Sequence, residues 1–219
     1  MTVGVLCGLH AEARIADKLP HVLVGCSGAR PERTRELTGY LIGKGVSRLI
    51  SFGLAAGLNE HVEAGDLLLG ATVVSLRGAW EADEKWNERF IECLPCYQCT
   101  PVWGGDKLLK TAKEKFGISV RSGCLIADME SHIVAEMAVQ ARIPFNVIRA
   151  VSDPLGMDLP PAARLPLLEE GRPDIGAIAR SVYEKPSQIM DLIRLGRNTS
   201  CALASLRRAV QMIAAVDEG

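Results

Sequence analysis

The stretch Ala127-Asp128-Met129-Glu130-Ser131-His132 decides how the rest of the chain is organised. Apolar residues recur at helical spacing over 129–141, so an amphipathic helix is expected there. The nearly continuous apolar run 145–151 follows and has the pattern of a central parallel strand. Because that strand ends in Asp153, the carboxylates of Glu130 and Asp153 stand at the two ends of one helix-strand unit. We interpret this unit as the centre of an active site.

Apolar, strand-like runs precede this unit and alternate with helical patterns. They cover residues 3–8, 21–25, 47–52, 67–74, 101–105 and 124–127. The alternation predicts one α/β domain over 1–219, with a central mixed, largely parallel twisted sheet flanked by helices. Prolines become frequent from Pro154 onward, which predicts a helical C-terminal extension over about 156–219.

Helices outside the central unit are expected in several places. They cover 32–44, 107–116, 187–195 and a final C-terminal segment. We expect Gly196 to end the third of these helices, and Asn198 or Thr199 to cap the last one. The segment 77–100 has the least regular pattern of the chain.

The composition narrows the class of protein. At 219 residues, 48% of them hydrophobic, the chain is long enough to bury a substantial core. A formal net charge of −1 gives no basic surface, so no nucleic-acid partner is expected. The chain shows neither an apolar stretch of roughly 18 residues nor a signal-peptide pattern. Seven irregularly spaced cysteines are typical of reduced thiols, so we expect a cytoplasmic protein.

Three of the cysteines, Cys93, Cys96 and Cys99, form a C-x-x-C-x-x-C run. Such a run is able to ligate zinc or an iron–sulfur cluster. A closed zinc site needs a fourth ligand, however, and the candidate His61 is distant in the sequence. We therefore interpret the run as three thiols in a loop, and we expect neither a metal nor another cofactor.

Small and polar residues follow the predicted strands, at the edge where ligands collect in open α/β sheets. Glu12 stands just beyond the first strand. Ser27-Gly28 precedes a helix N-terminus beside Arg30, which is the pattern of either an anion site or an ordinary capped helix. The stretch 53–58 is rich in small residues, which permit close backbone approach. It lacks the G-x-G-x-x-G pattern and a phosphate-binding lysine, so no dinucleotide-binding motif is supported.

Four stretches together resemble the nucleoside phosphorylase/nucleosidase superfamily, of the purine nucleoside phosphorylase and methylthioadenosine nucleosidase type. They are 8–12, 51–58 with Gly65-Asp66, 127–131, and Arg149-Ala150-Val151-Ser152-Asp153. The last two stretches, which are similar to Val-Glu-Met-Glu-Ala and Arg-Ala-Ile-Ser-Asp motifs, are the specific signal. The resemblance covers roughly residues 1–155. Within the family, Asp-Met-Glu-Ser-His and the proline-rich tail are most similar to the hopanoid-associated phosphorylases.

This resemblance implies an enzyme that cleaves N-ribosidic bonds, with Asp153 and Glu12 as the catalytic residues. Asp153 is expected to donate a proton to the leaving base, although it also suits a plain turn. Glu12 is expected to activate water. Glu130 is expected to accept hydrogen bonds from the ribose hydroxyls, with Met129 against the sugar. These two residues also suit the start of an amphipathic helix, and Asp128 is given only a capping role.

The resemblance also implies a nucleophile site and a base site. The residues expected there are Ser27, Gly28 and Arg149 for the nucleophile or phosphate, and Leu108, Leu109 and Ser152 for the base. Arg149 suits a structural salt bridge equally well. The two leucines stand where the family carries a Phe-Ile pair, and Leu54 and Ala56 stand where many nucleosidases carry Ser and Gly. The choice between water and phosphate as nucleophile stays open. Glu12 favours water, whereas the likeness to the hopanoid-associated phosphorylases favours phosphate.

The implied substrate is a small-molecule nucleoside, linked to a lipid in the hopanoid-associated branch, which acts on adenosylhopane. A methylthioadenosine/S-adenosylhomocysteine nucleosidase or another purine nucleoside phosphorylase is the alternative within the same class. A non-catalytic nucleoside- or lipid-binding protein is the alternative from another class. A homo-oligomer is expected from the resemblance. The C-terminal helices have two possible roles, which are contact with a membrane surface and ordinary packing on the sheet or at an oligomer interface.

Overall fold

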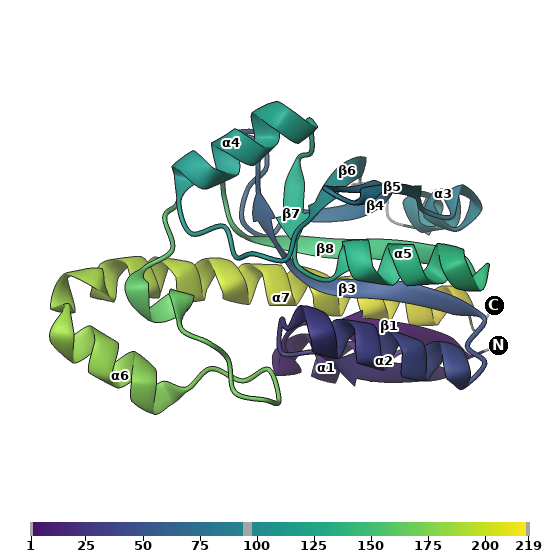
Figure 1. The fold of residues 1–219 in the computed structure, drawn as a ribbon, viewed down its shortest axis with the longest axis horizontal. Coiled ribbons are helices and arrows are strands. Elements are labelled where there is room, and N and C mark those ends of the chain that lie inside the picture. Colours follow the sequence, from purple (N-terminus) through teal and green to yellow (C-terminus); the bar gives the residue numbers. More distant parts are fainter. Residues whose placement is uncertain (1, 94–97, 218–219) are drawn as a thin grey trace.

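Strand β8 (Phe145–Asp153) lies in the middle of the sheet, and all of its residues are buried. Burial on both faces explains why its sequence is almost continuously apolar. It pairs in parallel with β3 (Arg48–Gly57) and antiparallel with β4 (Leu67–Ser75). The computed structural model describes residues 2–93 and 98–217, and it places this strand at the core of an eight-stranded sheet (Figure 1).

The other strands lie on the two sides of β8. Along the main path the order is β2 (Val22–Cys26), β1 (Val3–Cys7), β3, β7 (Ile126–Asp128), β6 (Gln98–Gly104), β4 and β5 (Gly78–Glu81). Because β8 bridges β3 and β4, the strands β3, β7, β6, β4 and β8 close into a ring. A β-bulge between Ala55 and Ala56 shifts the pairing of β3, whose end then pairs with β7. Most strand pairs are parallel, which confirms the predicted mixed sheet.

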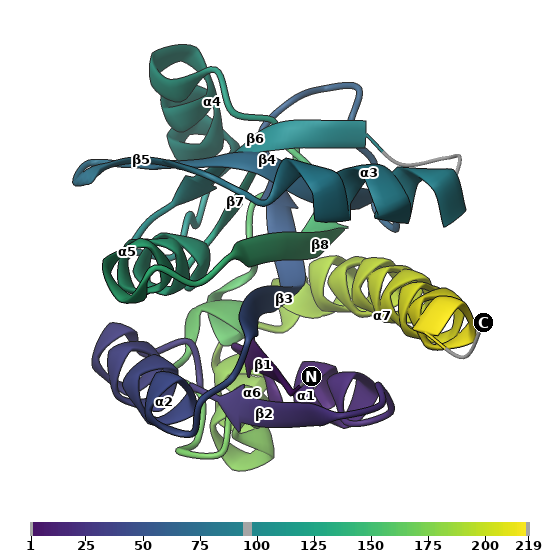
Figure 2. The same cartoon turned by 90° about the vertical axis from the view of Figure 1, so that its right-hand side faces the viewer.

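Helices cover both faces of the sheet (Figure 2). They are α1 (His10–Ala16), α2 (Pro31–Gly43), α3 (Glu84–Cys93), α4 (Ala112–Ser122), α5 (Ser131–Ala141), α6 (Ile175–Glu184) and α7 (Ile189–Asp217), with 3-10 turns η1 (Pro161–Arg164) and η2 (Pro186–Gln188). Ile148 and Ala150 of β8 face the cluster formed with α1 and α7, whereas Val147 and Val151 face α2 and α5. The alternation of side chains along a strand therefore divides the core into two layers.

Helix α4 begins later than the helix predicted over 107–116. Thr111 caps it, because its hydroxyl accepts a hydrogen bond from the Glu114 amide and the Glu114 carboxylate accepts one from the Thr111 amide. This capping box leaves Leu108 and Leu109 in the preceding loop. The segment 77–100 is also more regular than its sequence pattern indicated, since it contains β5 and α3.

Helix α7 runs without interruption through Gly196, so the predicted break there and the restart at Asn198 or Thr199 are wrong. A glycine inside a helix costs only about 1 kcal/mol relative to alanine. Burial of Ala202 and Leu206 against the sheet outweighs this cost. The C-terminal extension is therefore partly a core element, with α7 packed along β8 (Figure 1).

Two sequence expectations concern membranes and metals. Across residues 2–93 and 98–217, no helix is long and apolar enough to cross a bilayer. In the same ranges, no group of three or more His, Cys, Asp or Glu residues is placed to hold a metal ion. Cys96 and the side chain of Cys93 lie outside the described residues, and Cys99 is exposed. The metal hypothesis for that run therefore stays a hypothesis.

Candidate active site

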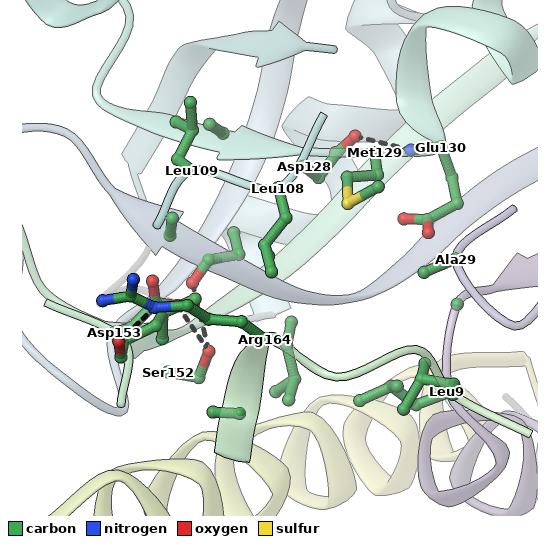
Figure 3. Close-up of a pocket in the computed structure, with 18 of the residues that line it drawn as sticks. Leu9, Ala29, Leu108, Leu109, Asp128, Met129, Glu130, Ser152, Asp153 and Arg164 are labelled. Atoms are coloured by element: carbon green, nitrogen blue, oxygen red, sulfur yellow. Dashed lines mark hydrogen bonds between the residues drawn. The ribbon is translucent and has the colours of Figure 1, made fainter. Parts of the chain in front are cut away.

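A cavity of about 520 Å³ lies at the carboxyl ends of β1, β3 and β8 (Figure 3). Ligands bind at this edge in open α/β sheets, and small-molecule sites typically have volumes of ~300–1,000 Å³. Most of the predicted site residues line it together, namely Glu12, Gly28, Leu108, Leu109, Met129, Glu130, Ser152 and Asp153. Ser27 and Arg149 are buried and are not part of the lining.

Glu12 reaches the cavity from the first turn of α1. Its Oε2 accepts hydrogen bonds from the amides of Gly8 and Leu9, at 2.9 and 2.8 Å, and its Oε1 accepts one from Leu54, at 2.8 Å. Burial raises the pKa of this carboxyl, while Arg149 and the three amides oppose the shift. A Cβ at Gly53 would lie 2.6 Å from the carboxyl carbon of Glu12, so only glycine permits this approach.

Glu130 lies at the start of α5 against the buried Arg149. The Nη2 atom of Arg149 is 3.3 Å from Oε2 of Glu130, and it donates a hydrogen bond of 2.6 Å to the hydroxyl of Ser51. Burial raises the pKa of Glu130 to about 7; Arg149 opposes this shift, and Asp128 and Glu12 add to it. A Cβ at Gly8 would lie 2.7 Å from Oε1 of Glu130, so the residue directly after β1 is also a glycine for steric reasons.

Asp128 does more than the capping expected of it. It does cap α5, because its Oδ1 accepts hydrogen bonds from the amides of Glu130 and Ser131, at 3.0 and 2.8 Å. Its Oδ2 also lies 2.8 Å from Nε of Arg149, as an ion pair without the alignment of a hydrogen bond. The Ser131 hydroxyl donates to the same oxygen. Arg149 is therefore held by two carboxylates, of which only that of Glu130 was predicted as part of the site, and neither was predicted as its partner.

Asp153 ends β8 at the opposite end of the cavity from Glu130 (Figure 3). The hydroxyl of Ser152 donates a hydrogen bond of 2.9 Å to its Oδ1, and Nζ of Lys115 lies 2.9 Å from its Oδ2. Burial raises the pKa of the Asp153 carboxyl, whereas Lys115 lowers it. Sequence reasoning missed Lys115, because nothing local distinguishes it from the exposed Lys113 on the same helix.

The loop of Ser27 and Gly28, which is predicted to bind the nucleophile, lies only partly in the cavity. The Ser27 hydroxyl donates to the carbonyl of Cys7, at 3.3 Å, so it is directed at the protein backbone. Gly28 and Ala29 have positive φ angles of 66° and 54°, and both line the cavity. The guanidinium of Arg30 donates to the carbonyl of Glu169, at 3.3 Å.

The segment after η1 forms a wall that the sequence did not predict. Three of its residues, Leu165, Pro166 and Leu167, line the cavity together with Leu159 and Leu195. The segment returns towards β1 (Figure 1), where the carbonyl of Gly171 accepts a hydrogen bond of 3.1 Å from the His10 amide. With Leu108 and Leu109 on the loop before α4, this wall makes the lining largely apolar away from the carboxylates.

Fold and site together define the class of protein, which is an α/β enzyme with buried carboxylates at the strand ends of one cavity. A family model described as the phosphorylase superfamily matches residues 18–170. The chain therefore belongs to this superfamily. The predicted membership of the nucleoside phosphorylase/nucleosidase superfamily, and of an enzyme class acting on N-ribosyl bonds, is confirmed.

Solved structures share the fold over nearly the whole chain. The futalosine hydrolase of Helicobacter pylori has a TM-score of 0.74 at 14% identity, covering 100% of this chain and 98% of that one. A 5'-methylthioadenosine/S-adenosylhomocysteine nucleosidase from Neisseria meningitidis, in complex with methylthio-immucillin-A, has a TM-score of 0.72 at 14% identity, covering 98% and 99%. At such identities the likeness shows the fold alone. No curated protein sequence matches the chain significantly.

Proposed function

We propose that the protein is a nucleosidase that hydrolyses the N-ribosidic bond of an adenosyl compound and releases adenine. The observation that carries this proposal is the placement of Glu12, Glu130 and Asp153 around one cavity, each with a pKa raised by burial. Cleavage of a glycosidic bond needs an acid for the leaving group and stabilisation of an oxocarbenium-like sugar. Carboxyl groups at the two ends of the cavity supply both.

Asp153 is the proton donor in this proposal. Adenine leaves poorly as an anion, so it needs a proton at N7 as the bond breaks. A raised pKa lets the buried carboxyl hold that proton closer to neutral pH than an exposed aspartate does. Ser152 fixes one oxygen of the carboxyl, and Leu108 and Leu109 provide the apolar surface for the base.

Glu130 holds the ribose, with its carboxylate accepting hydrogen bonds from the sugar hydroxyls. Met129 lines the cavity beside it and packs against the sugar. Three carboxyl groups, those of Glu12, Asp128 and Glu130, surround the single guanidinium of Arg149. This excess of negative groups stabilises positive charge as it develops on the sugar.

Water is the nucleophile in this proposal, and Glu12 is its base. Two of the three residues expected to bind phosphate have side chains that are engaged elsewhere, since Arg149 pairs with Asp128 and Glu130, and the Ser27 hydroxyl bonds to a carbonyl. The carboxylates of Glu12 and Glu130, which line the same part of the cavity, repel a phosphate anion. The nucleophile end therefore favours hydrolysis over phosphorolysis.

Adenosylhopane is the substrate we propose for this site. The wall of Leu159, Leu165, Leu167 and Leu195 offers an apolar surface to a bulky substituent of the ribose. Exposed apolar side chains continue on α6 and the start of α7, where Ile175 is 69% and Met190 73% exposed. Peripheral membrane contact through these helices, like the homo-oligomer, stays a prediction.

The test is an assay of adenine release from adenosylhopane and from 5'-methylthioadenosine, each with and without phosphate. We expect release that does not depend on phosphate and is faster with adenosylhopane. Turnover of the small thio-nucleoside alone would remove the hopanoid assignment, and a sugar phosphate product would remove hydrolysis. Binding of either nucleoside without release would identify a non-catalytic binding protein.

A further inference from the structure

Lys115 places a fully buried ammonium group in a cage of oxygen atoms. Its Nζ lies 2.9 Å from Oδ2 of Asp153, and its side chain is 0% exposed. It also donates to the carbonyl oxygens of Asp153, Pro154 and Met157, at 3.0, 2.9 and 2.9 Å. All four oxygens belong to the end of β8 and the turn that follows it. A buried ammonium is stable only when it is compensated in this way.

The cage holds more acceptors than the ammonium group needs. A lysine has three N–H donors, and the three carbonyl groups are enough to satisfy them. The carboxylate of Asp153 is therefore not required to keep Lys115 in place. The orientation of the Asp153 carboxyl, by contrast, does depend on Lys115. In the part of the chain that the structure describes, Lys115 and the Ser152 hydroxyl are the polar side chains that bond to its two oxygens.

Lys115 also connects the acid to the base side of the cavity. It lies in the first turn of α4, directly after the loop that carries the two cavity-lining leucines. Two hydrogen bonds join this region to the turn after β8. The Ala112 amide donates to Oδ1 of Asp158, at 2.7 Å, and the Leu159 amide donates to the carbonyl of Lys110, at 2.9 Å. The acid and the base loop are thus held as one unit.

We propose that Lys115 is a positioning residue, which orients the Asp153 carboxyl for proton transfer to the leaving base. This inference rests on the proposed function, in which Asp153 is the proton donor. Lys115 acts on the substrate only indirectly, since it is fully buried and does not line the cavity. Its charge has a second effect, because it limits the rise in the pKa of Asp153 that burial causes. The carboxyl is then able to release its proton as well as to hold it.

The test compares Lys115→Gln, which removes the charge and keeps two of the three N–H donors, with Lys113→Gln on the exposed side of the same helix. Adenine release is measured with the faster of adenosylhopane and 5'-methylthioadenosine. For Lys115→Gln we expect kcat to fall by about 10- to 100-fold with little change in KM. The basic limb of the kcat/KM profile should move to higher pH, since loss of a positive neighbour raises the pKa of Asp153. Lys113→Gln should change neither.

Asp153→Asn and the double variant separate this inference from the proposed function. If Lys115 acts through Asp153, Lys115→Gln should lower kcat less than about 3-fold further in the Asp153→Asn background. An equal loss in both backgrounds, or an unmoved pH limb, would overturn the positioning role. Wild-type kcat in Asp153→Asn would instead overturn the proposed proton donor.

Folding of each variant is checked by its thermal unfolding curve and near-ultraviolet circular dichroism. Should Lys115→Gln fail to fold, Lys115→Arg decides the question. The charge is kept, but the larger guanidinium displaces the Asp153 carboxyl in the closed cage, so kcat should fall at least about 3-fold with the basic limb unmoved. A wild-type kcat in that variant would overturn the inference.

Discussion

The base end and the sugar end of the cavity both bury carboxylates against a cation, but in different ratios. At the base end, Asp153 forms an ion pair of 2.9 Å with Lys115, and this is its one salt bridge within residues 2–93 and 98–217. At the sugar end, Arg149 lies 2.8 Å from Asp128 and 3.3 Å from Glu130, with further carboxylate charge from Glu12. The buried ion pair at the base end is therefore balanced in charge, whereas negative groups are in excess around Arg149 at the sugar end.

This difference shows how one fold prepares two kinds of carboxyl group. Where negative neighbours crowd together, burial raises the pKa of Glu130 to about 7, and the site is suited to a cationic sugar. Where a single lysine balances a single aspartate, the carboxyl keeps a fixed orientation suited to directed proton transfer. Changes at each end should therefore have different signatures.

The largest effect is expected from Asp153→Asn at the base end. Loss of a general acid typically lowers kcat by about 10²- to 10⁴-fold, and we expect this range with KM nearly unchanged. Steady-state kinetics of adenine release measure it, with the exposed Asp191→Asn as the matched control. A rise in KM with kcat unchanged would assign Asp153 to substrate binding, and it would contradict the difference described between the two ends of the cavity.

At the sugar end, Arg149→Met should lower the free energy of unfolding by about 3–5 kcal/mol, because it leaves buried carboxylates without their cation. The loss should be greater at pH 8 than at pH 5.5, where protonation of Glu130 relieves the repulsion. Urea denaturation at both pH values measures it, and the exposed Arg121→Met is the control. A loss independent of pH would contradict the excess of charge proposed here.

Glu130→Gln should stabilise the free protein at alkaline pH. The pKa of the Glu130 carboxyl is higher in the folded protein than in the unfolded chain. The free energy of unfolding therefore falls as the pH rises from about 4.5 to about 7. The variant lacks this loss, so at pH 8 its free energy of unfolding should exceed that of the wild type by about 1–3 kcal/mol, although ribose binding is weakened. Melting temperatures of the variant and the wild type across that pH range measure the effect, with the exposed Glu88→Gln as the control. Equal melting temperatures of Glu130→Gln and the wild type at every pH would show that Arg149 fully compensates the Glu130 charge.

The smallest effect is expected at the apolar surface of the base end. Leu108 is 38% exposed and lines the cavity, so Leu108→Ala should remove about 1 kcal/mol of apolar contact and raise KM about 5-fold. Its kcat should stay close to that of the wild type. Leu76→Ala, at a side chain that is 94% exposed, is the control. A fall in kcat without a change in KM would mean that the base loop acts on Asp153 rather than on the base.

Local sequence patterns were sufficient wherever one short segment carries its own signal. The sequence of β8 is a continuous apolar run because the strand is buried on both faces, and the apolar residues of α5 recur at helical spacing because the helix is buried on one face. Both elements were therefore predicted close to their observed bounds. The start of α4 was missed because the capping box at Thr111 was not recognised. The continuity of α7 through Gly196 was missed because tertiary packing, rather than local preference, holds that helix together.

The sequence by itself determined the mixed α/β sheet and the superfamily, and it placed Glu12, Glu130 and Asp153 after the strands that bring them to one cavity. Chain order is enough for this, since strand ends of a parallel sheet meet at one edge. Only the tertiary structure decided which cations pair with the carboxylates and which segments wall the cavity. It placed Lys115 beside Asp153, the Asp128 carboxylate beside Arg149, and the apolar segment after η1 along the cavity. Lys115 lies 38 residues from Asp153 in the chain, so no local pattern links the two. Burial in three dimensions selects such partners, because it raises the cost of every unpaired charge.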